Sequence, residues 1–348
     1  MHLVGIVLYS SLLVQGMSLA LLNGSLAIGS IKLATNIIIT ICGILMFSAN
    51  SKNILSEKFA AWFVVYVAAV TLFTIIIKGL EFTPFPKFNF EYTSSFQKQE
   101  TAYSQELSKF FGYGAAAAAV VYVNQKNKLI KYIFFFIAVI FLFLSFVGGA
   151  RGDSVAALFV VVSYLVISNP VRFLLWLALI VFAVYFGVQD WAWLNNFTIF
   201  ERLLDLKYNL GYRDILLAQS FELLFREPSC LVFGCGFGYF QLYFSYPYDL
   251  YPHNVLVESV IVFGIPIALV YIFSIAGGLW LYLHRCGRLD LLILFFVYSL
   301  LVGLKSGALF QDWFFTAGCI YFSSVYFHKM VIRNHAPYPA MVSSGVKS

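Results

Sequence analysis

The stretch IKYIFFFIAVIFLFLSFVG, residues 130–148, carries no charge apart from Lys131 and decides the fold class. A helix needs roughly 20 apolar residues to cross a hydrocarbon core of about 30 Å. The whole chain of 348 residues has the same character, with 61% hydrophobic residues, 11% charged residues and a mean hydropathy of +0.86. These values exclude an ordinary soluble domain, and runs of this length favour helices over barrel strands. The sequence therefore predicts an integral membrane protein.

Similar apolar runs recur along nearly the whole chain, which predicts an all-α polytopic membrane protein with one transmembrane domain over residues 1–348. We expect about ten transmembrane helices, at residues 3–22, 31–49, 59–77, 110–123, 130–148, 154–169, 171–188, 255–283, 289–304 and 307–327. The first run has no basic leader and no small-residue cleavage site behind it. We therefore expect a retained helix there rather than a signal peptide.

The basic residues predict the orientation of these helices, because Lys and Arg favour the cytoplasmic ends of short loops. With both termini inside, eleven basic residues lie inside and three lie in short outer loops. The inner eleven are Lys52, Lys58, Lys126, Lys128, Lys131, Arg172, Arg285, Arg288, Lys329, Arg333 and Lys347, and the outer three are Lys32, Arg151 and Lys305. Residues 78–109 and 189–253 then form two larger external loops. No basic stripe with interleaved aromatics is present, so nucleic acid is not an expected partner.

His253 is the one histidine of five that this topology places outside. It lies between Pro252 and Asn254, at the point where a tyrosine-rich polar stretch gives way to an apolar run. Asn254 is a good candidate for the N-cap of the following helix. The Pro-His-Asn sequence fits either a simple capping turn or a reactive imidazole at the membrane surface, and the spacing alone leaves both interpretations open.

Two other external stretches contain arginine. VGGARGDS, residues 147–154, is a Gly-rich turn that holds Arg151 at the membrane surface, and its Arg-Gly-Asp tripeptide is too short a match to predict adhesion. In residues 210–240, apolar positions 216, 217, 221, 224 and 225 predict one face of an interfacial helix. Arg213 lies in the first turn of this helix, and Pro228 ends it.

The same external stretch holds a glycine-rich turn and two cysteines. The spacing of Gly234, Gly236 and Gly238 does not fit a dinucleotide-binding fingerprint, and we expect a flexible turn. Cys230 and Cys235 can pair in an oxidising compartment, but their spacing does not decide it. The external carboxylates are scattered and form no recognisable metal-ligand set, so we expect neither a metal nor another cofactor.

Taken in order, these features resemble the O-antigen ligase and polymerase superfamily over residues 151–266. The features are an arginine at a membrane-edge turn, Arg-x-x-x-Leu from Arg213, a Pro, Gly-x-Gly-x-Gly, His-Asn, and a glycine eleven residues after the histidine. The family often continues with Gly-x-x-Gly, whereas this chain reads Gly264-Ile265-Pro266-Ile267. The resemblance implies a fold like the C superfamily of glycosyltransferases, in the bacterial inner membrane. The loops 78–109 and 189–253 then face the periplasm, as does the active site.

The chemistry that the resemblance implies is transfer of a glycan from undecaprenyl pyrophosphate to a hydroxyl group. Arginine forks bind phosphate oxygens bidentately, which assigns Arg151 and Arg213 to the pyrophosphate. A neutral imidazole can accept the proton of the incoming hydroxyl, which assigns His253 as the catalytic base. Asn254 and Glu258 are supporting residues, and a capping or packing role is an equal alternative for Glu258.

Three functions remain open. The leading hypothesis is an O-antigen polymerase, which joins a growing chain to a new lipid-linked repeat unit. The second is an O-antigen ligase, which moves the finished chain to lipid A core. A transporter or flippase for lipid-linked sugars is the third, but it needs polar groups deep in the spans, where almost all positions are apolar. The expected partners are undecaprenyl-pyrophosphate-linked glycans, membrane lipid, and a chain-length regulator and flippase of the same pathway.

Overall fold

The computed structural model describes residues 2–25, 57–78, 80–81, 87–88, 105–147, 150–170, 212–247, 250–286, 289–307, 309 and 312–335. This part of the chain is helical, apart from the short antiparallel pair β1 (Leu80–Glu81) and β2 (Lys87–Phe88). Its twelve helices are α1 (His2–Leu22), α3 (Glu57–Lys78), α4 (Gln105–Asn124), α5 (Lys128–Val147), α6 (Arg151–Ser168), α9 (Tyr212–Arg226), α10 (Pro228–Phe233), α11 (Tyr239–Phe244), α12 (Val255–Phe263), α13 (Ile265–Cys286), α14 (Leu291–Ser306) and α15 (Trp313–His335).

The prediction of a helical fold is confirmed for the described part of the chain, and its long apolar helices suggest a membrane protein. Three helices are long and apolar enough to cross a membrane, and they comprise residues Glu57–Ile76, Lys128–Val147 and Ile265–His284. Shorter apolar helical segments cover Val7–Leu22, Gly152–Ser168 and Leu291–Ser306. Two of the ten predicted spans, 31–49 and 171–188, lie outside the described residues. The ten-helix topology therefore stays a prediction.

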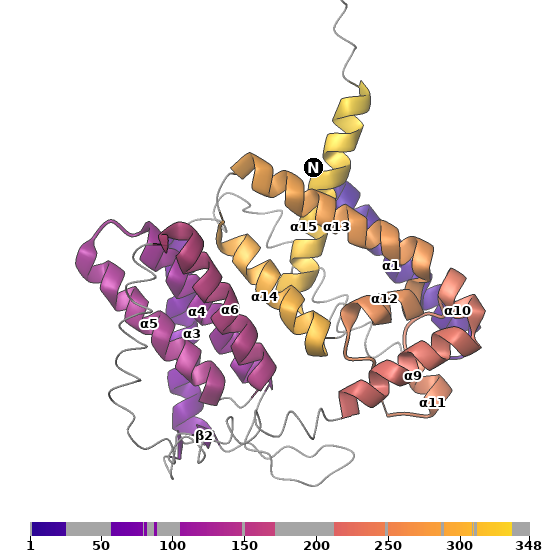
Figure 1. The fold of residues 1–348 in the computed structure, drawn as a ribbon, viewed down its shortest axis with the longest axis horizontal. Helices are drawn as coiled ribbons and strands as arrows, with labels where there is room; N and C mark the ends of the chain where they lie inside the picture. The colour runs from indigo at the N-terminus through magenta and orange to yellow at the C-terminus, as the bar shows by residue number, and fades with distance from the viewer. Residues whose placement is uncertain are drawn as a thin grey trace, which may run out of the picture.

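Helix α14 lies between two groups of helices (Figure 1). On one side it packs against α4 and α6, and Leu294, Phe295 and Tyr298 belong to the core that these helices share with α3 and α5. On the other side it packs against α12 and α15, and Phe296 belongs to the second core, which these helices share with α1 and α13. A helix that is apolar all round must be covered all round. This explains why the sequence of α14, LLILFFVYSLLVGLKS, has no polar face.

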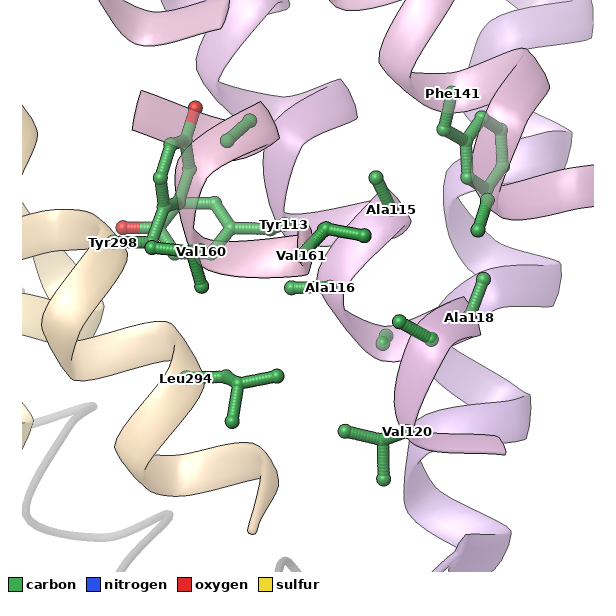
Figure 2. Close-up of a cluster of buried hydrophobic side chains, with 14 of the residues drawn as sticks. Tyr113, Ala115, Ala116, Ala118, Val120, Phe141, Val160, Val161, Leu294 and Tyr298 are labelled. Atoms are coloured by element: carbon green, nitrogen blue, oxygen red, sulfur yellow. The ribbon is translucent and has the colours of Figure 1, made fainter. Parts of the chain in front are cut away.

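Small side chains bring α4 close to its neighbours. Residues Ala115–Ala119 are all buried, and the helix packs against α3, α5, α6 and α14. Figure 2 shows Ala115, Ala116 and Ala118 of this run among Phe141 of α5, Val160 and Val161 of α6, and Leu294 of α14. Small residues let helix backbones approach closely inside a membrane. From the sequence, the alanine run predicts only a short and weakly apolar span. In the structure it lies at the centre of the core that α4 forms with α3, α5, α6 and α14.

The predicted span 255–283 is wrong as a single helix, because α12 ends at Phe263 and α13 begins at Ile265. Gly264 between them has φ +79°, outside the helical region. Pro266 has no amide to donate to the carbonyl of Val262, so a continuous helix would lose a hydrogen bond there. The freed carbonyls of Ile261 and Val262 instead accept hydrogen bonds from the amides of Cys235 at 2.7 Å and Gly236 at 3.1 Å.

The glycine-rich turn is correspondingly not a flexible turn, which corrects the prediction for Gly234, Gly236 and Gly238. All three have positive φ and are buried. A Cβ on Gly234 would meet the backbone of residues 262–264, and one on Gly236 would meet the backbone of α1. The amide of Phe237 also donates to the carbonyl of Gly16 at 3.2 Å. The glycines therefore let the turn pack backbone to backbone between α1 and the break at Gly264.

Candidate functional site

Polar side chains gather where several helix ends meet. The starts of α4, α6, α12 and α15, the end of α14 and the helix α9 all contribute to this group, which we call the polar end. The start of α6, the end of α14 and helix α9 lie on the lower side of Figure 1. The sequence places every one of these segments on the external side. Their spatial grouping agrees with that common assignment, while the side of the membrane stays a prediction.

The turn before α12 holds His253 in a defined conformation. Asn254 is the N-cap of α12, as predicted, and its side-chain oxygen accepts the amides of Leu256 at 3.0 Å and Val257 at 3.2 Å. Its Nδ2 donates to the carbonyl of Leu304 at 2.9 Å, which fixes the turn to the end of α14. His253 itself has φ +54°, a conformation that is uncommon outside glycine and marks functional or strained positions.

Tyr251 supports the histidine from the other side. The two ring centroids are 4.0 Å apart, and the Tyr251 hydroxyl donates to the carbonyl of Ser306 at 3.1 Å. Burial raises the pKa of the Tyr251 phenol, with a further contribution from the Glu258 carboxylate, while the Arg213 guanidinium acts in the opposite direction. His253 therefore lies half-buried beside a fixed aromatic ring, and the charges of Glu258 and Arg213 act on that ring.

Glu258 is buried, and its carboxylate accepts the amide of Leu309 at 2.6 Å. This hydrogen bond joins α12 to the connection between α14 and α15. It gives Glu258 a structural contact, in line with the packing alternative. The charge of Glu258 also acts on Tyr251, so the residue contributes to the electrostatic surroundings of the histidine turn.

Two predicted arginines belong to the same end of the protein. Arg213, in the first turn of α9, is half-buried and forms no salt bridge or hydrogen bond within the described part of the chain. Its guanidinium acts electrostatically on Asp153 and on Tyr251, which places it near both the α6 start and the histidine turn. Arg151 begins α6, but its side chain lies outside the described atoms.

Asp153 and Lys305 form an ion pair that the sequence did not predict. Asp153 is fully buried, and its Oδ1 lies 3.2 Å from the Nζ of Lys305. A Cβ on Gly152 would overlap the end of the Lys305 side chain, so the lysine passes directly over this glycine and would have to shift to accommodate a larger residue. The Arg-Gly-Asp tripeptide therefore forms an internal contact, and its buried aspartate cannot serve as an adhesion motif.

A second charged group lies next to this pair. Lys109 Nζ is 3.5 Å from Asp312 Oδ2, and the Tyr113 hydroxyl donates to Asp312 Oδ1 at 2.9 Å. Asp312 also accepts the amide of Phe315 at 3.0 Å and so begins α15. Burial lowers the pKa of Lys109, but the carboxylates of Asp312, Glu106 and Asp153 outweigh this effect and leave the pKa raised. Asp312 thus holds Lys109 as a charged internal partner.

Helix α9 agrees with the predicted interfacial helix in position and ending, but its apolar face differs. Leu216 and Leu224 are buried as expected, together with Leu223. Phe221 and Phe225 are exposed instead. The helix therefore has a buried leucine side and a separate exposed aromatic side, which suits a helix with protein on one face and lipid on another.

The residues that sequence reasoning missed are Asp153, Lys305, Lys109 and Asp312. Each is a charge at the end of an apolar run on the predicted external side, and charges in such places are costly unless they pair or serve a function. That signal could have selected them. Within the described residues, no group of three or more His, Cys, Asp or Glu lies together as a metal site would require.

In comparisons with known proteins, no family model, no curated protein and no solved structure matches this chain.

Proposed function

We propose that this protein is a glycosyltransferase that uses a polyprenyl-pyrophosphate-linked glycan, and specifically an O-antigen polymerase. The observation that carries the proposal is Arg213, a half-buried guanidinium without a salt-bridge partner among the described residues, in electrostatic range of the Tyr251–His253 turn. A charge that is partly removed from water is less stable unless an opposite charge compensates it. An anionic substrate group that binds Arg213 beside His253 would provide that compensation, and a diphosphate at the membrane edge meets this requirement.

The reaction assigns one role to each group. The bond between the anomeric carbon and the phosphate oxygen breaks, and the lipid diphosphate leaves with that electron pair. Arg213, together with Arg151 as the resemblance implies, stabilises the negative charge on this leaving group. The acceptor hydroxyl forms the new bond to the anomeric carbon, and its proton passes to the imidazole of His253. Asn254 and Tyr251 hold the turn that carries the imidazole.

The disulfide between Cys230 and Cys235 supports an active site on the periplasmic side of a bacterial inner membrane. It joins α10 to the glycine-rich turn, which is hydrogen-bonded to the last carbonyls of α12. Disulfides form and persist in oxidising compartments and are rare in the cytosol. A pair in this segment therefore favours the predicted external position of residues 189–253.

The disulfide gives a direct test of that position. In protein denatured in acid from intact cells, we expect an alkylating agent to modify three of the five cysteines before reduction and all five afterwards. The measurement is the intact mass of the alkylated protein. A Cys230→Ser/Cys235→Ser variant should show the same three modifications under both conditions. If all five cysteines of the unaltered protein react without reduction, the segment faces a reducing compartment and the proposed orientation is wrong.

The function itself is tested by deletion in the native host and gel analysis of the surface polysaccharide. A polymerase predicts a lipid A core that carries a single repeat unit, because chains cannot grow while ligation continues. Bare core with lipid-linked polymer accumulating would instead indicate the ligase. Bare core with lipid-linked single units on the inner side of the membrane would indicate the flippase. An unchanged ladder would contradict all three functions. Complementation with His284→Gln, a histidine on α13 far along the chain from the turn, is the matched positive control.

The expected partners follow from this proposal. They are the growing and the incoming undecaprenyl-pyrophosphate-linked glycans, the surrounding lipid, and a flippase and a chain-length regulator that act before and during chain growth. The proposal needs no metal and no other cofactor, because the diphosphate is already a good leaving group and the cations of the polar end can stabilise it.

A further inference from the structure

We propose that Lys305 is a further diphosphate-binding residue and that Asp153 holds it in place until the diphosphate arrives. This inference rests on the proposed function and adds a residue to the same site. Neither residue belongs to the arginine and histidine set that the sequence predicts. The ligand chemistry is the diphosphate of a prenyl-linked glycan, bound between Lys305 and Arg213.

Lys305 lies at the boundary between the surface and the interior of the protein. Its Nζ lies 3.2 Å from Asp153 Oδ1, and its side chain is 30% exposed while that of Asp153 is fully buried. The lysine therefore reaches from a partly open surface to an internal carboxylate. Its path runs directly over Gly152, which has no side chain in the way. The aspartate end of the ion pair is buried and the lysine end is partly exposed. The Lys305 ammonium group can therefore turn toward a ligand at the surface while its stem stays in place.

Several cations surround the Asp153 carboxylate. Lys305, Lys109 and Arg213 all act electrostatically on this one carboxylate. Lys109 is already compensated by Asp312 and Glu106. Lys305 and Arg213 are then two cations from different helices, α14 and α9, that act on the same buried carboxylate. Two cations at one point favour the binding of an additional anion there.

Within the described part of the chain, the Asp153 carboxylate is hydrogen-bonded through only one of its two oxygens. Its Oδ2 is buried and accepts no hydrogen bond from the described residues, although a buried carboxylate oxygen normally has a partner. A carboxylate that is only partly satisfied holds its lysine less firmly than a fully bonded one. A diphosphate, with more oxygens and more charge, can therefore compete with Asp153 for Lys305.

The opposing explanation is that Lys305 only neutralises Asp153. The two explanations predict different effects of removing Lys305 once Asp153 is neutral. If Lys305 binds diphosphate, Asp153→Asn frees the lysine and strengthens binding, and further loss of the lysine weakens it. If the pair is only structural, Asp153→Asn strengthens binding only through Arg213, on which this carboxylate also acts, and further loss of Lys305 changes nothing. The double variant Lys305→Met/Asp153→Asn removes both charges, so it avoids the uncompensated buried aspartate that Lys305→Met alone would leave.

The experiment measures farnesyl pyrophosphate binding to the purified full chain in phosphatidylcholine nanodiscs by calorimetry. We expect Asp153→Asn to bind roughly threefold to tenfold more tightly than the unaltered protein. We expect the double variant to bind about tenfold more weakly than Asp153→Asn. Lys126→Met, at an exposed lysine between α4 and α5, is the control and should bind like the unaltered protein. Melting temperatures without ligand should agree for Asp153→Asn and the double variant.

Three results would overturn the proposal. The first is a double variant that binds as tightly as Asp153→Asn, which would make Lys305 a structural partner. The second is loss of binding when phosphatidylglycerol replaces phosphatidylcholine, which would mean that the site takes lipid headgroups. The third is an unaltered protein that does not bind farnesyl pyrophosphate, in which case the proposed function fails as well. Binding that needs Arg213, by loss in Arg213→Ala, but not Lys305 would remove only the inference about Lys305.

Discussion

Replacement of His253 by Gln is expected to lower the rate of glycan transfer by about 10²–10⁴-fold, the usual contribution of a general base. Gln keeps the size and polarity of the side chain but cannot accept the hydroxyl proton. The Asn254 cap and the Tyr251 hydrogen bond to α14 do not depend on the imidazole, so the turn should stay in place. The measurement is chain extension by purified enzyme from a lipid-linked repeat unit, at saturating substrate.

The backbone at this position supplies the control that separates catalysis from folding. With φ +54°, residue 253 suits Asn, which tolerates the left-handed region better than most residues. We therefore expect His253→Asn to melt at least as high as the unaltered protein and to be as inactive as His253→Gln. If His253→Asn or His253→Gln folds and still builds long chains, the imidazole is not the base. His253 would then be a residue of the capping turn only.

The class of protein and most of the helices could be predicted from the sequence. A helix that crosses a membrane needs a long run of apolar residues, and such a run can be recognised whichever apolar residues form it. The run 130–148 became α5, and 59–77 became α3. The break at Gly264 was missed because the apolar pattern continues across it without interruption. Only the pair Gly264 and Pro266 signals the break, and its meaning depends on the distant turn at Gly234 that supplies the hydrogen-bond donors.

The candidate site was predictable where its residues act locally. The role of Asn254 as a cap follows from its neighbours in sequence, and the structure confirms it. The pair of Asp153 and Lys305 joins residues from α6 and α14, and no local pattern links them. Their meeting depends on how the helices pack around α14. The resemblance therefore selects Arg213 and His253 as candidates, but not the lysine of the Asp153 pair.

The break between α12 and α13 connects the packing of the protein with its site. Helix α12 carries Asn254 and Glu258 at one end and ends at Gly264 at the other. The glycine-rich turn is hydrogen-bonded to the last carbonyls of α12 and to α1. The Cys230–Cys235 disulfide constrains the same turn. A change in the backbone at Gly264 would therefore move α12, and with it the histidine turn.

Gly264→Ala is accordingly expected to destabilise the protein by about 3 kcal/mol or more, because strain and overpacking act together at this position. Gly264 has φ +79°, which alanine rarely adopts, and the added Cβ would overlap the carbonyl of Val232. The neighbour is backbone and cannot rotate away. The measurement is thermal unfolding in detergent, and we expect a fall of several degrees together with reduced transfer activity.

Gly303→Ala in α14 is the matched control for this substitution. Gly303 has a helical backbone, and its added Cβ would only come into ordinary contact with Val255 Cγ1 at 3.5 Å. Alanine stabilises a helix interior relative to glycine by roughly 0.5–1 kcal/mol, so Gly303→Ala should melt no lower than the unaltered protein. If Gly264→Ala melts as high as Gly303→Ala, the backbone contact between residues 232–234 and 264 does not hold α12. The glycine-rich turn would then have no part in positioning His253.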